Sequence, residues 1–403
     1  MISTLQLFRL AFGATALIAT GAVTAQISGD VVRIGFITDI SGPLADNDGS
    51  GGLEAIRMAV ADFGSQVAGK PIEVLSADHQ NKADIAAAKA REWADREGID
   101  MIVGGANSAA MLAINNLLPE KKFVFLVISA GATQFTNEAC TPYTVQYAYN
   151  TTALARAVGS AIVGQGGKSW YFLTTDYAFG HSLEAETAKV VTETGGTVAG
   201  KVRHPLSNSD FSSFLLKAQA SKAQVLGMAN SGSDLLNSIK GAREFGLNKS
   251  MKLAGLVMFM NNMESIGLKT AQGLLMSEPW YWDQSDASRA FAQRYFAKTK
   301  RMPNSLQAAD YSATWNYLQA VKAANSDEPG KVMEQLRKMQ IDDMYAKGYI
   351  RADGQMIHDF YLYEVKKPEE SKKPWDFLKQ VAVIPGDKAF DPLSASTCNL
   401  LKK

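Results

Sequence analysis

The chain has 403 residues, of which 46% are hydrophobic and 20% are charged, and its formal net charge is +1. This is the composition of an ordinary globular protein, which excludes a disordered, collagen-like or disulfide-dense chain. The near-neutral charge also argues against a nucleic-acid binder or a polybasic membrane-surface protein. Because the chain is longer than one hydrophobic core normally fills, we expect two domains.

Residues 1–25 have the pattern of a secretory signal peptide. Arg9 is followed by a short apolar run, and Val23 and Ala25 fit the small-residue positions of a cleavage site. The alternative, a membrane anchor, needs about 18 consecutive apolar residues, and this run is shorter. Since Gln26 is not a cysteine, lipid attachment is also disfavoured. The sequence therefore predicts export and a mature chain that begins at Gln26.

The chain contains two cysteines and four histidines. In an oxidising compartment an even number of cysteines favours a disulfide, so we expect Cys140 and Cys398 to pair. The histidines stand far apart in the sequence, at His79, His181, His204 and His358. No metal-binding spacing joins them, so no metal site is predicted and each histidine is expected to have a structural role.

Strands and helices alternate through the first part of the mature chain. Short apolar β-branched runs predict strands at 31–40, 71–78, 100–105 and 123–130. The segments between them have helical apolar spacing, at 53–64, 83–97 and 108–118. Alternation of this kind indicates βαβ units and a parallel sheet with helices on both faces.

The same alternation restarts near residue 151. The predicted strands are 169–176, 197–205, 224–230 and 252–259. The predicted helices are 152–165, 182–194, 211–220 and 233–245. Both halves pass from a strand through Thr-Asp to a glycine before a helix, at 35–42 and 171–180, which is a faint internal repeat. We therefore expect an α/β protein with two lobes, each built on a doubly wound parallel sheet.

The last third of the chain has a different pattern. A strand at 273–283 runs into an aromatic cluster, and three helices are predicted at 286–300, 305–324 and 330–340. A hairpin is expected at 348–365, with its turn at Ala352, Asp353 and Gly354. Nothing in the sequence is typical of a flexible linker, so we expect the chain to cross between the lobes several times.

The sequence contains none of the common nucleophile, phosphate-loop, redox-thiol or calcium-loop motifs. The glycine-rich stretch at 49–52 lacks the spacing of a dinucleotide-binding loop. Asp39, Asp176 and Asp310 are candidate paired carboxylates, but such residues more often lie in turns or cap helices. We therefore predict a protein that is not an enzyme and has no cofactor.

A long, nearly uncharged region contains two strand-to-helix junctions, at 103–111 and 127–137. Each junction offers hydroxyls and free backbone N–H groups at the end of a strand, which is where open α/β sheets bind ligands. A helix start near Asn107 or Ser108 can hold an anion without a lysine or arginine. The alternative is that Asn107 and Ser108 only cap their own helix.

The motifs VRIGFITDISGPLA, GLEAIRMAVADF, VLSADHQNKADIAAAKAREW and GGANSAAMLAINNLLPEKKFVFLVISAGATQFT together resemble one known family. They are similar to the extracytoplasmic solute-binding proteins of branched-chain-amino-acid-type ABC transporters. The resemblance covers the mature chain from Val31 to the C-terminal tail. It implies a type I periplasmic binding fold, with two lobes that are joined by three crossovers and close on a ligand like a hinged clamp.

The resemblance also implies a division of the chain and a set of partners. Lobe 1 would contain residues 26–147 and 278–355, and lobe 2 would contain residues 148–277 and 356–403 with the C-terminal tail. Hinges are expected near 146–148, 277–280 and 354–357. The implied partners are a small-molecule carboxylate and a membrane permease, with no nucleic acid, for a monomer in the periplasm.

In that family a serine at the start of the third helix and a small-residue turn hold the ligand carboxylate. The matching positions here are Ser108 and the turn of Gly131, Ala132 and Thr133. The family's amino-acid binders hold the ligand ammonium with a glutamate and a tyrosine. This chain has Val257 or Met258 at the glutamate position and Phe179 at the tyrosine position. An ammonium without an acceptor would carry a large desolvation cost.

Apolar and aromatic residues replace those polar groups and predict a flat or apolar ligand. The predicted ligand contacts are Asn107, Ser108, Ala130, Gly131, Thr133, Tyr177, Phe179, Asn230, Met258 and Trp280, with Tyr149, Phe259, Tyr281 and Trp282 close by. We therefore expect an aromatic acid of the benzoate or cinnamate type. One alternative is a branched-chain amino acid or small amide, with Asp39, Asp176 or Asp310 as counter-charge. The other is a ligand-sensing domain of the same fold.

Overall fold

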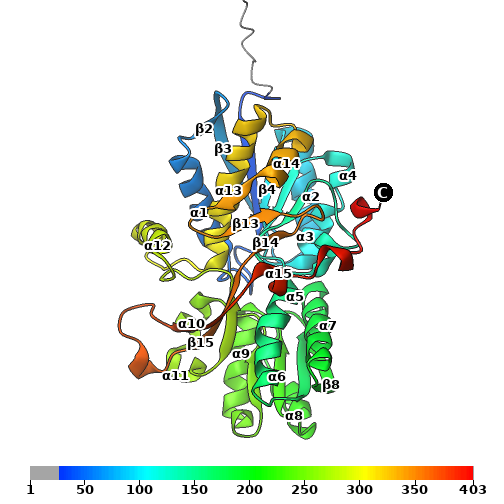
Figure 1. Ribbon diagram of the computed structural model, residues 1–403, viewed down its shortest axis with the longest axis vertical. Helices are drawn as coiled ribbons and strands as arrows, with labels where there is room; N and C mark the ends of the chain where they lie inside the picture. Colours follow the sequence, from blue (N-terminus) through cyan, green and yellow to red (C-terminus); the bar gives the residue numbers. More distant parts are fainter. Residues whose placement is uncertain (1–26, 403) are drawn as a thin grey trace, which may run out of the picture.

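The computed structural model describes residues 27–402. The predicted signal peptide at 1–25 therefore lies outside the described residues. Figure 1 shows two lobes, one above the other, and several segments of chain that pass between them. Among the described residues, no helix is both long enough and apolar enough to span a bilayer.

The sheet of lobe 1 has six strands in the order β2-β3-β1-β4-β5-β6. Their bounds are β1 Val32–Thr38, β2 Gln66–Val67, β3 Lys70–Asp78, β4 Met101–Gly104, β5 Val124–Val127 and β6 Thr144–Gln146. All pairings are parallel except that of β2 with β3. Strands β4 and β5 are buried at every residue, which explains why they are uninterrupted apolar runs in the sequence.

Helices cover both faces of this sheet. Successive apolar side chains of β1 point to opposite faces, so each face needs a layer of helices to bury them. Ile34 and Phe36 pack in the cluster that contains α1 residues, whereas Ile37 packs in a second cluster with residues of α2 and α3. Figure 1 shows α1 and α13 on one side of the sheet and α2 and α3 on the other. The helices of lobe 1 are α1 Gly49–Asp62, α2 Ala83–Glu92, α3 Ser108–Asn115, α4 Leu118–Lys121, α12 Asp286–Thr299, α13 Ser305–Ala324 and α14 Pro329–Lys338.

Lobe 2 has a four-stranded parallel sheet in the order β10-β9-β7-β8. The strands are β7 Ser169–Thr175, β8 Thr197–His204, β9 Val225–Ala229 and β10 Lys252–Gly255. The helices are α5 Thr151–Leu154, α6 Ser160–Gly164, α7 Ala178–Glu193, α8 Ser212–Ala220, α9 Gly232–Glu244, α10 Met260–Ile266 and α11 Leu268–Ala271. The predicted α/β class with two doubly wound lobes is confirmed.

Two three-stranded antiparallel sheets complete the fold. One contains β11 Leu275–Glu278, β15 Phe360–Val365 and β16 Leu378–Ile384, and the other contains β12 Gln340–Asp342, β13 Lys347–Ile350 and β14 Met356–His358. The chain crosses between lobes after β6, after β11 and between β14 and β15, as the three predicted crossovers require. Two of these crossovers touch, since Gln355 Nε2 donates to the carbonyl oxygen of Gln146 at 3.1 Å. The exact lobe and hinge bounds stay predictions.

The C-terminal tail fastens onto both lobes. It contains the short helix α15 (Gly386–Ala389), and Arg156 of lobe 2 pairs with Asp391. The predicted disulfide is confirmed: Cys140 and Cys398 are bonded, with 5.6 Å between their Cα atoms. The tail that the resemblance groups with lobe 2 is thus covalently tied to lobe 1.

Three predicted elements are shorter than expected. The predicted helix 83–97 is α-helical only to Glu92 and continues as a π-helical turn, Trp93–Glu97. The predicted strand 252–259 ends at Gly255, and the Met258 side chain lies 2.4 Å from where a Cβ on that glycine would be. The junction at 127–137 forms a short 3-10 turn, Thr133–Thr136, instead of a full helix.

Candidate functional site

The first junction places Asn107 and Ser108 at the start of α3. The Asn107 Oδ1 atom accepts hydrogen bonds from the amides of Ala109, at 2.9 Å, and Ala110, at 3.1 Å. Asn107 therefore caps its own helix, which is the alternative that the sequence left open. Ser108 follows at the first helical position and is fully buried.

The second junction forms a turn at 131–133, after strand β5, that lies directly against Ser108. The Ser108 Oγ atom accepts a hydrogen bond from the Ala132 amide at 3.3 Å. The structure thus brings together the two segments that the sequence predicts to hold a carboxylate. We call Ser108 and residues 131–133 the hydroxyl turn. Among the described residues, the side chains that hydrogen-bond to these four residues are all uncharged.

Lobe 2 contributes a serine that the sequence analysis did not predict. Ser182 Oγ lies 3.4 Å from the Thr133 amide nitrogen and 3.5 Å from Thr133 Oγ1, and Thr151 Oγ1 is 2.6 Å from the same oxygen. Ser182 lies inside α7, although the sequence predicts that helix to begin at this residue. The sequence feature that could have pointed to Ser182 is a hydroxyl near the start of a helix that follows a strand of the second sheet. Ser182 joins the hydroxyl turn to the opposite lobe.

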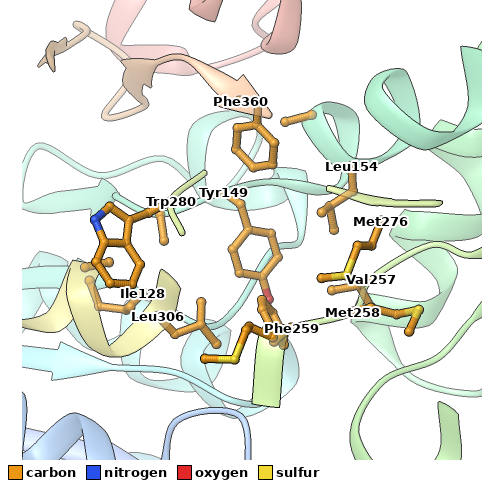
Figure 2. Packing of buried hydrophobic residues seen from close by; sticks show 14 of the residues in the cluster. Ile128, Tyr149, Leu154, Val257, Met258, Phe259, Met276, Trp280, Leu306 and Phe360 are labelled. Carbon is orange, nitrogen blue, oxygen red and sulfur yellow. The ribbon is translucent and has the colours of Figure 1, made fainter. Parts of the chain in front are cut away.

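Aromatic rings pack against the same turn. A Cβ at Gly131 would lie 2.4 Å from the Tyr149 ring and 3.1 Å from the Phe179 ring, so only glycine fits here. The Phe179 ring is 6.2 Å from the ring of Tyr177, and the Tyr149 ring is 6.1 Å from that of Phe259. Figure 2 shows Tyr149 at the centre of this packing, with Phe259 beside its hydroxyl end.

Three predicted contacts have structural partners away from the hydroxyl turn. Trp280 Nε1 donates to the carbonyl oxygen of Met344 at 2.9 Å, and Figure 2 shows its ring to one side of Tyr149. Asn230 Nδ2 is 3.1 Å from His204 Nε2, inside lobe 2. Met258 packs against Gly255. A ligand contact for these three residues stays a prediction.

The three candidate counter-charges each have other surroundings than a ligand ammonium would need. Asp39 accepts from the amides of Gly42 and Leu44, both at 2.8 Å, and holds its own loop. The Asp176 side chain is 54% exposed and pairs with a surface histidine. Burial and the adjacent Asp48 carboxyl raise the pKa of Asp310 well above its usual range, which disfavours its charged form.

The lobes are in contact, and a cavity of about 470 Å³ lies on the seam between them. Pro43 and Asp46 of lobe 1 line it together with Gly232, Ser233 and Asn262 of lobe 2. Each lobe is built on a parallel sheet, three crossovers connect the lobes, and the lobes meet at the C-terminal ends of their strands. This arrangement is typical of two-lobed ligand-binding proteins.

A family model described as "Periplasmic binding protein" matches residues 31–372, so the chain belongs to the periplasmic binding protein family. This family consists of binding proteins, which confirms that the chain is not an enzyme. The chain is 27% identical over 239 residues to a Leu/Ile/Val-binding protein homolog of Brucella melitensis. That match spans 60% of the length of the Brucella protein.

Solved structures agree with this assignment. A periplasmic binding protein from Burkholderia mallei is 64% identical with a TM-score of 0.92, covering 93% of this chain and 100% of that one. A branched-chain amino acid ABC transporter ligand-binding protein from Burkholderia xenovorans is 39% identical with a TM-score of 0.81. The match covers 92% of this chain and 99% of that one. A protein from Rhodopseudomonas palustris in complex with 3,4-dihydroxybenzoic acid has a TM-score of 0.80, covering 89% and 98%, and at 23% identity shows the fold alone. The predicted resemblance is confirmed.

Proposed function

We propose that this protein is the periplasmic solute-binding component of an ABC uptake transporter. Its ligand is a small carboxylate, preferably an aromatic acid, that the lobes enclose between them. The observation that carries the proposal is the hydroxyl turn, an uncharged set of donors packed against the rings of Tyr149 and Phe179. The partner is a membrane permease that receives the ligand from the closed protein.

The hydroxyl turn suits a carboxylate because its donors are fixed and neutral. The Ser108 hydroxyl, the Thr133 hydroxyl and the Thr133 amide converge within two short segments. A ligand oxygen between the lobes would take the place of the Ser182 contact at Thr133. Hydrogen bonds from neutral donors to a charged group contribute about 1.5–3 kcal/mol each, so three of them hold a carboxylate without a lysine or arginine.

An aromatic body is preferred to an ammonium because of what surrounds the turn. Asp39 is used by its own loop, and burial raises the pKa of Asp310 and so disfavours its carboxylate form. Neither residue therefore suits a buried cation as a counter-charge. Desolvating an unpaired ammonium is costly. The faces and edges of Tyr149, Phe179 and Phe259 instead favour a flat ring, which gains from offset or edge-on packing.

A branched-chain amino acid is the second candidate ligand. It is favoured by the branched-chain amino acid ABC transporter ligand-binding protein of Burkholderia xenovorans, which is 39% identical to this chain. This ligand needs an acceptor for its ammonium, for which Asp39 or Asp176 would have to leave its present partners.

Calorimetric titration of the mature protein with benzoate, cinnamate and leucine distinguishes these ligands. We expect an aromatic acid to bind at least about tenfold more tightly than leucine, a difference of about 1.4 kcal/mol. Ser108→Ala and Thr133→Val should each weaken the binding about tenfold or more, since each removes a bond to a charged group. Thr197→Val, at an exposed position of β8, is the matched control and should have no effect. Tight leucine binding without any response to aromatic acids would contradict the proposal.

A further inference from the structure

Buried asparagines from both lobes meet at the interlobe seam. Asn47 precedes α1 and Asn304 caps α13 in lobe 1, while Asn261 lies in α10 of lobe 2. Their exposed fractions are 4%, 1% and 4%. Asn304 Nδ2 donates to the carbonyl oxygen of Asn47 at 2.6 Å and to Asn261 Oδ1 at 2.9 Å. Asn261 Nδ2 in turn donates to the carbonyl oxygen of Asp46.

A second contact lies at the start of α9. Asn47 Nδ2 donates to Ser231 Oγ at 3.0 Å, and the Ser233 amide donates to the Pro43 carbonyl oxygen at 3.1 Å. Gly232 stands between them with a φ of +59°, and a Cβ there would lie 2.4 Å from the Pro43 oxygen. The backbones of the two lobes therefore approach as closely as only glycine permits.

An arginine adds an ionic link at the rim of the seam. Arg301 of lobe 1 pairs with Asp46 at 2.7 Å and with Glu264 of lobe 2 at 2.9 Å. All three side chains are between 39% and 46% exposed, so solvent and salt screen these pairs. The buried amide contacts are therefore the main part of the seam.

We infer that Asn47, Asn261, Asn304 and Ser231 form a latch that favours the closed conformation in the absence of ligand. None of them belongs to the hydroxyl turn or to the aromatic side chains packed near it, Tyr149, Phe179 and Phe259. Each of their interlobe hydrogen bonds exists only while the lobes touch, so the latch shifts the population toward the closed state without contacting the ligand. Because a ligand binds the closed state best, its apparent affinity rises in proportion to the fraction of protein that is already closed. Asn261 is thus a positioning residue that sets affinity, an effect that rests on the proposed function.

Two variants of the mature protein test the latch. Asn261→Ala removes the donor to Asp46 and the acceptor from Asn304, and Ser231→Ala removes one hydroxyl in case the first variant folds poorly. Asn248→Ala, exposed in lobe 2, is the matched control. Small-angle scattering of the ligand-free proteins reports closure, and calorimetry with benzoate reports affinity. We expect both latch variants to have a larger ligand-free radius of gyration than the wild type and the control. We also expect them to bind benzoate about three- to tenfold more weakly.

The two measurements separate the latch from the ligand assignment. An unchanged ligand-free radius for both variants overturns the latch, whatever benzoate does. A larger ligand-free radius together with no benzoate binding by the wild type supports the latch and contradicts the aromatic ligand. An unchanged benzoate affinity in variants that are more open without ligand overturns the coupling of the latch to affinity.

Discussion

Gly131 shows how one absent side chain shapes the hydroxyl turn at the scale of a residue. The rings of Tyr149 and Phe179 occupy the space that a Cβ would need. Tyr149 is also held at its other end, because its hydroxyl donates to the Ser129 carbonyl oxygen at 3.2 Å. The Tyr149 ring therefore packs against the turn and is hydrogen-bonded to the segment that follows β5.

Gly131→Ala should consequently destabilise the protein. The new methyl would lie 2.4 Å from the Tyr149 ring, and overpacking of this kind typically costs about 1–3 kcal/mol. Thermal unfolding measures the effect as a lower Tm. The matched control is Gly164→Ala, at the end of α6, where a Cβ meets nothing within 4 Å and alanine should be neutral or slightly stabilising. Equal Tm values for the two variants would show that the ring moves aside freely.

Glu278 is a second residue with a predictable effect. It is buried in β11, accepts from the Met260 amide at 2.7 Å and contacts the Ser305 hydroxyl. Burial raises its pKa from 4.5 to about 8. The folded protein therefore holds a proton that the unfolded chain releases above pH 4.5. The stabilisation is complete below that pH and is lost as the pH rises to about 8, with a slope of up to about 1.4 kcal/mol per pH unit.

Denaturant unfolding at pH 5, 7 and 9 tests this effect. Glu278→Gln is neutral at every pH, so its stability should fall less steeply over this range than that of the wild type. Glu193→Gln, exposed at the end of α7, is the control and should follow the wild type. The prediction is wrong if the Glu278→Gln slope equals the wild-type slope. Asp100, whose pKa burial raises to about 7, contributes equally to all three proteins.

At the scale of elements, the C-terminal tail depends on its attachments. It contains little regular structure, and Ser396 Oγ donates to the Thr136 carbonyl oxygen at 2.7 Å beside the Cys140–Cys398 bond. The Arg351 guanidinium also donates to the carbonyl oxygen of Asp391 at 2.6 Å. Since the disulfide closes a loop of 258 residues, it restricts the unfolded chain strongly.

Replacing both cysteines by serine should lower the free energy of unfolding by about 2–5 kcal/mol, which is typical for loss of a native disulfide. Denaturant titration of the oxidised wild type and of the double variant measures the change. The wild type under reducing conditions is the control and should behave like the double variant. A double variant as stable as the oxidised wild type would mean that the noncovalent contacts alone fasten the tail.

At the scale of the whole molecule, binding should close the two lobes. Two of the crossovers are in contact, since His358 Nε2 lies 3.0 Å from the Ala148 carbonyl oxygen, and we expect the lobes to rotate about this region. We expect the radius of gyration in solution to fall when an aromatic acid saturates the protein. Identical scattering profiles with and without a ligand that calorimetry shows to bind would contradict the clamp.

The sequence by itself determined the lobes, the parallel sheets and the disulfide. Buried parallel strands must be apolar along their whole length, so β4 and β5 are visible as uninterrupted runs. Two cysteines in a chain that is predicted to be exported have one possible pairing within it, and the structure contains it. Ser108 and Thr133 could be predicted as ligand contacts because small polar residues at strand ends are a local pattern, and the structure brings their two segments together.

Only the tertiary structure decided which residues from distant segments meet. Across the seam, Ser182 hydrogen-bonds to Thr133 and Asn261 hydrogen-bonds to Asp46. No local sequence pattern indicates a contact between residues so far apart in the chain. For Trp280 and Met258 the sequence leaves a core role and a ligand contact open, because an aromatic or apolar side chain at a strand end suits a core and a binding site equally. The tertiary structure shows that Trp280 hydrogen-bonds to the Met344 carbonyl oxygen and that Met258 packs against Gly255.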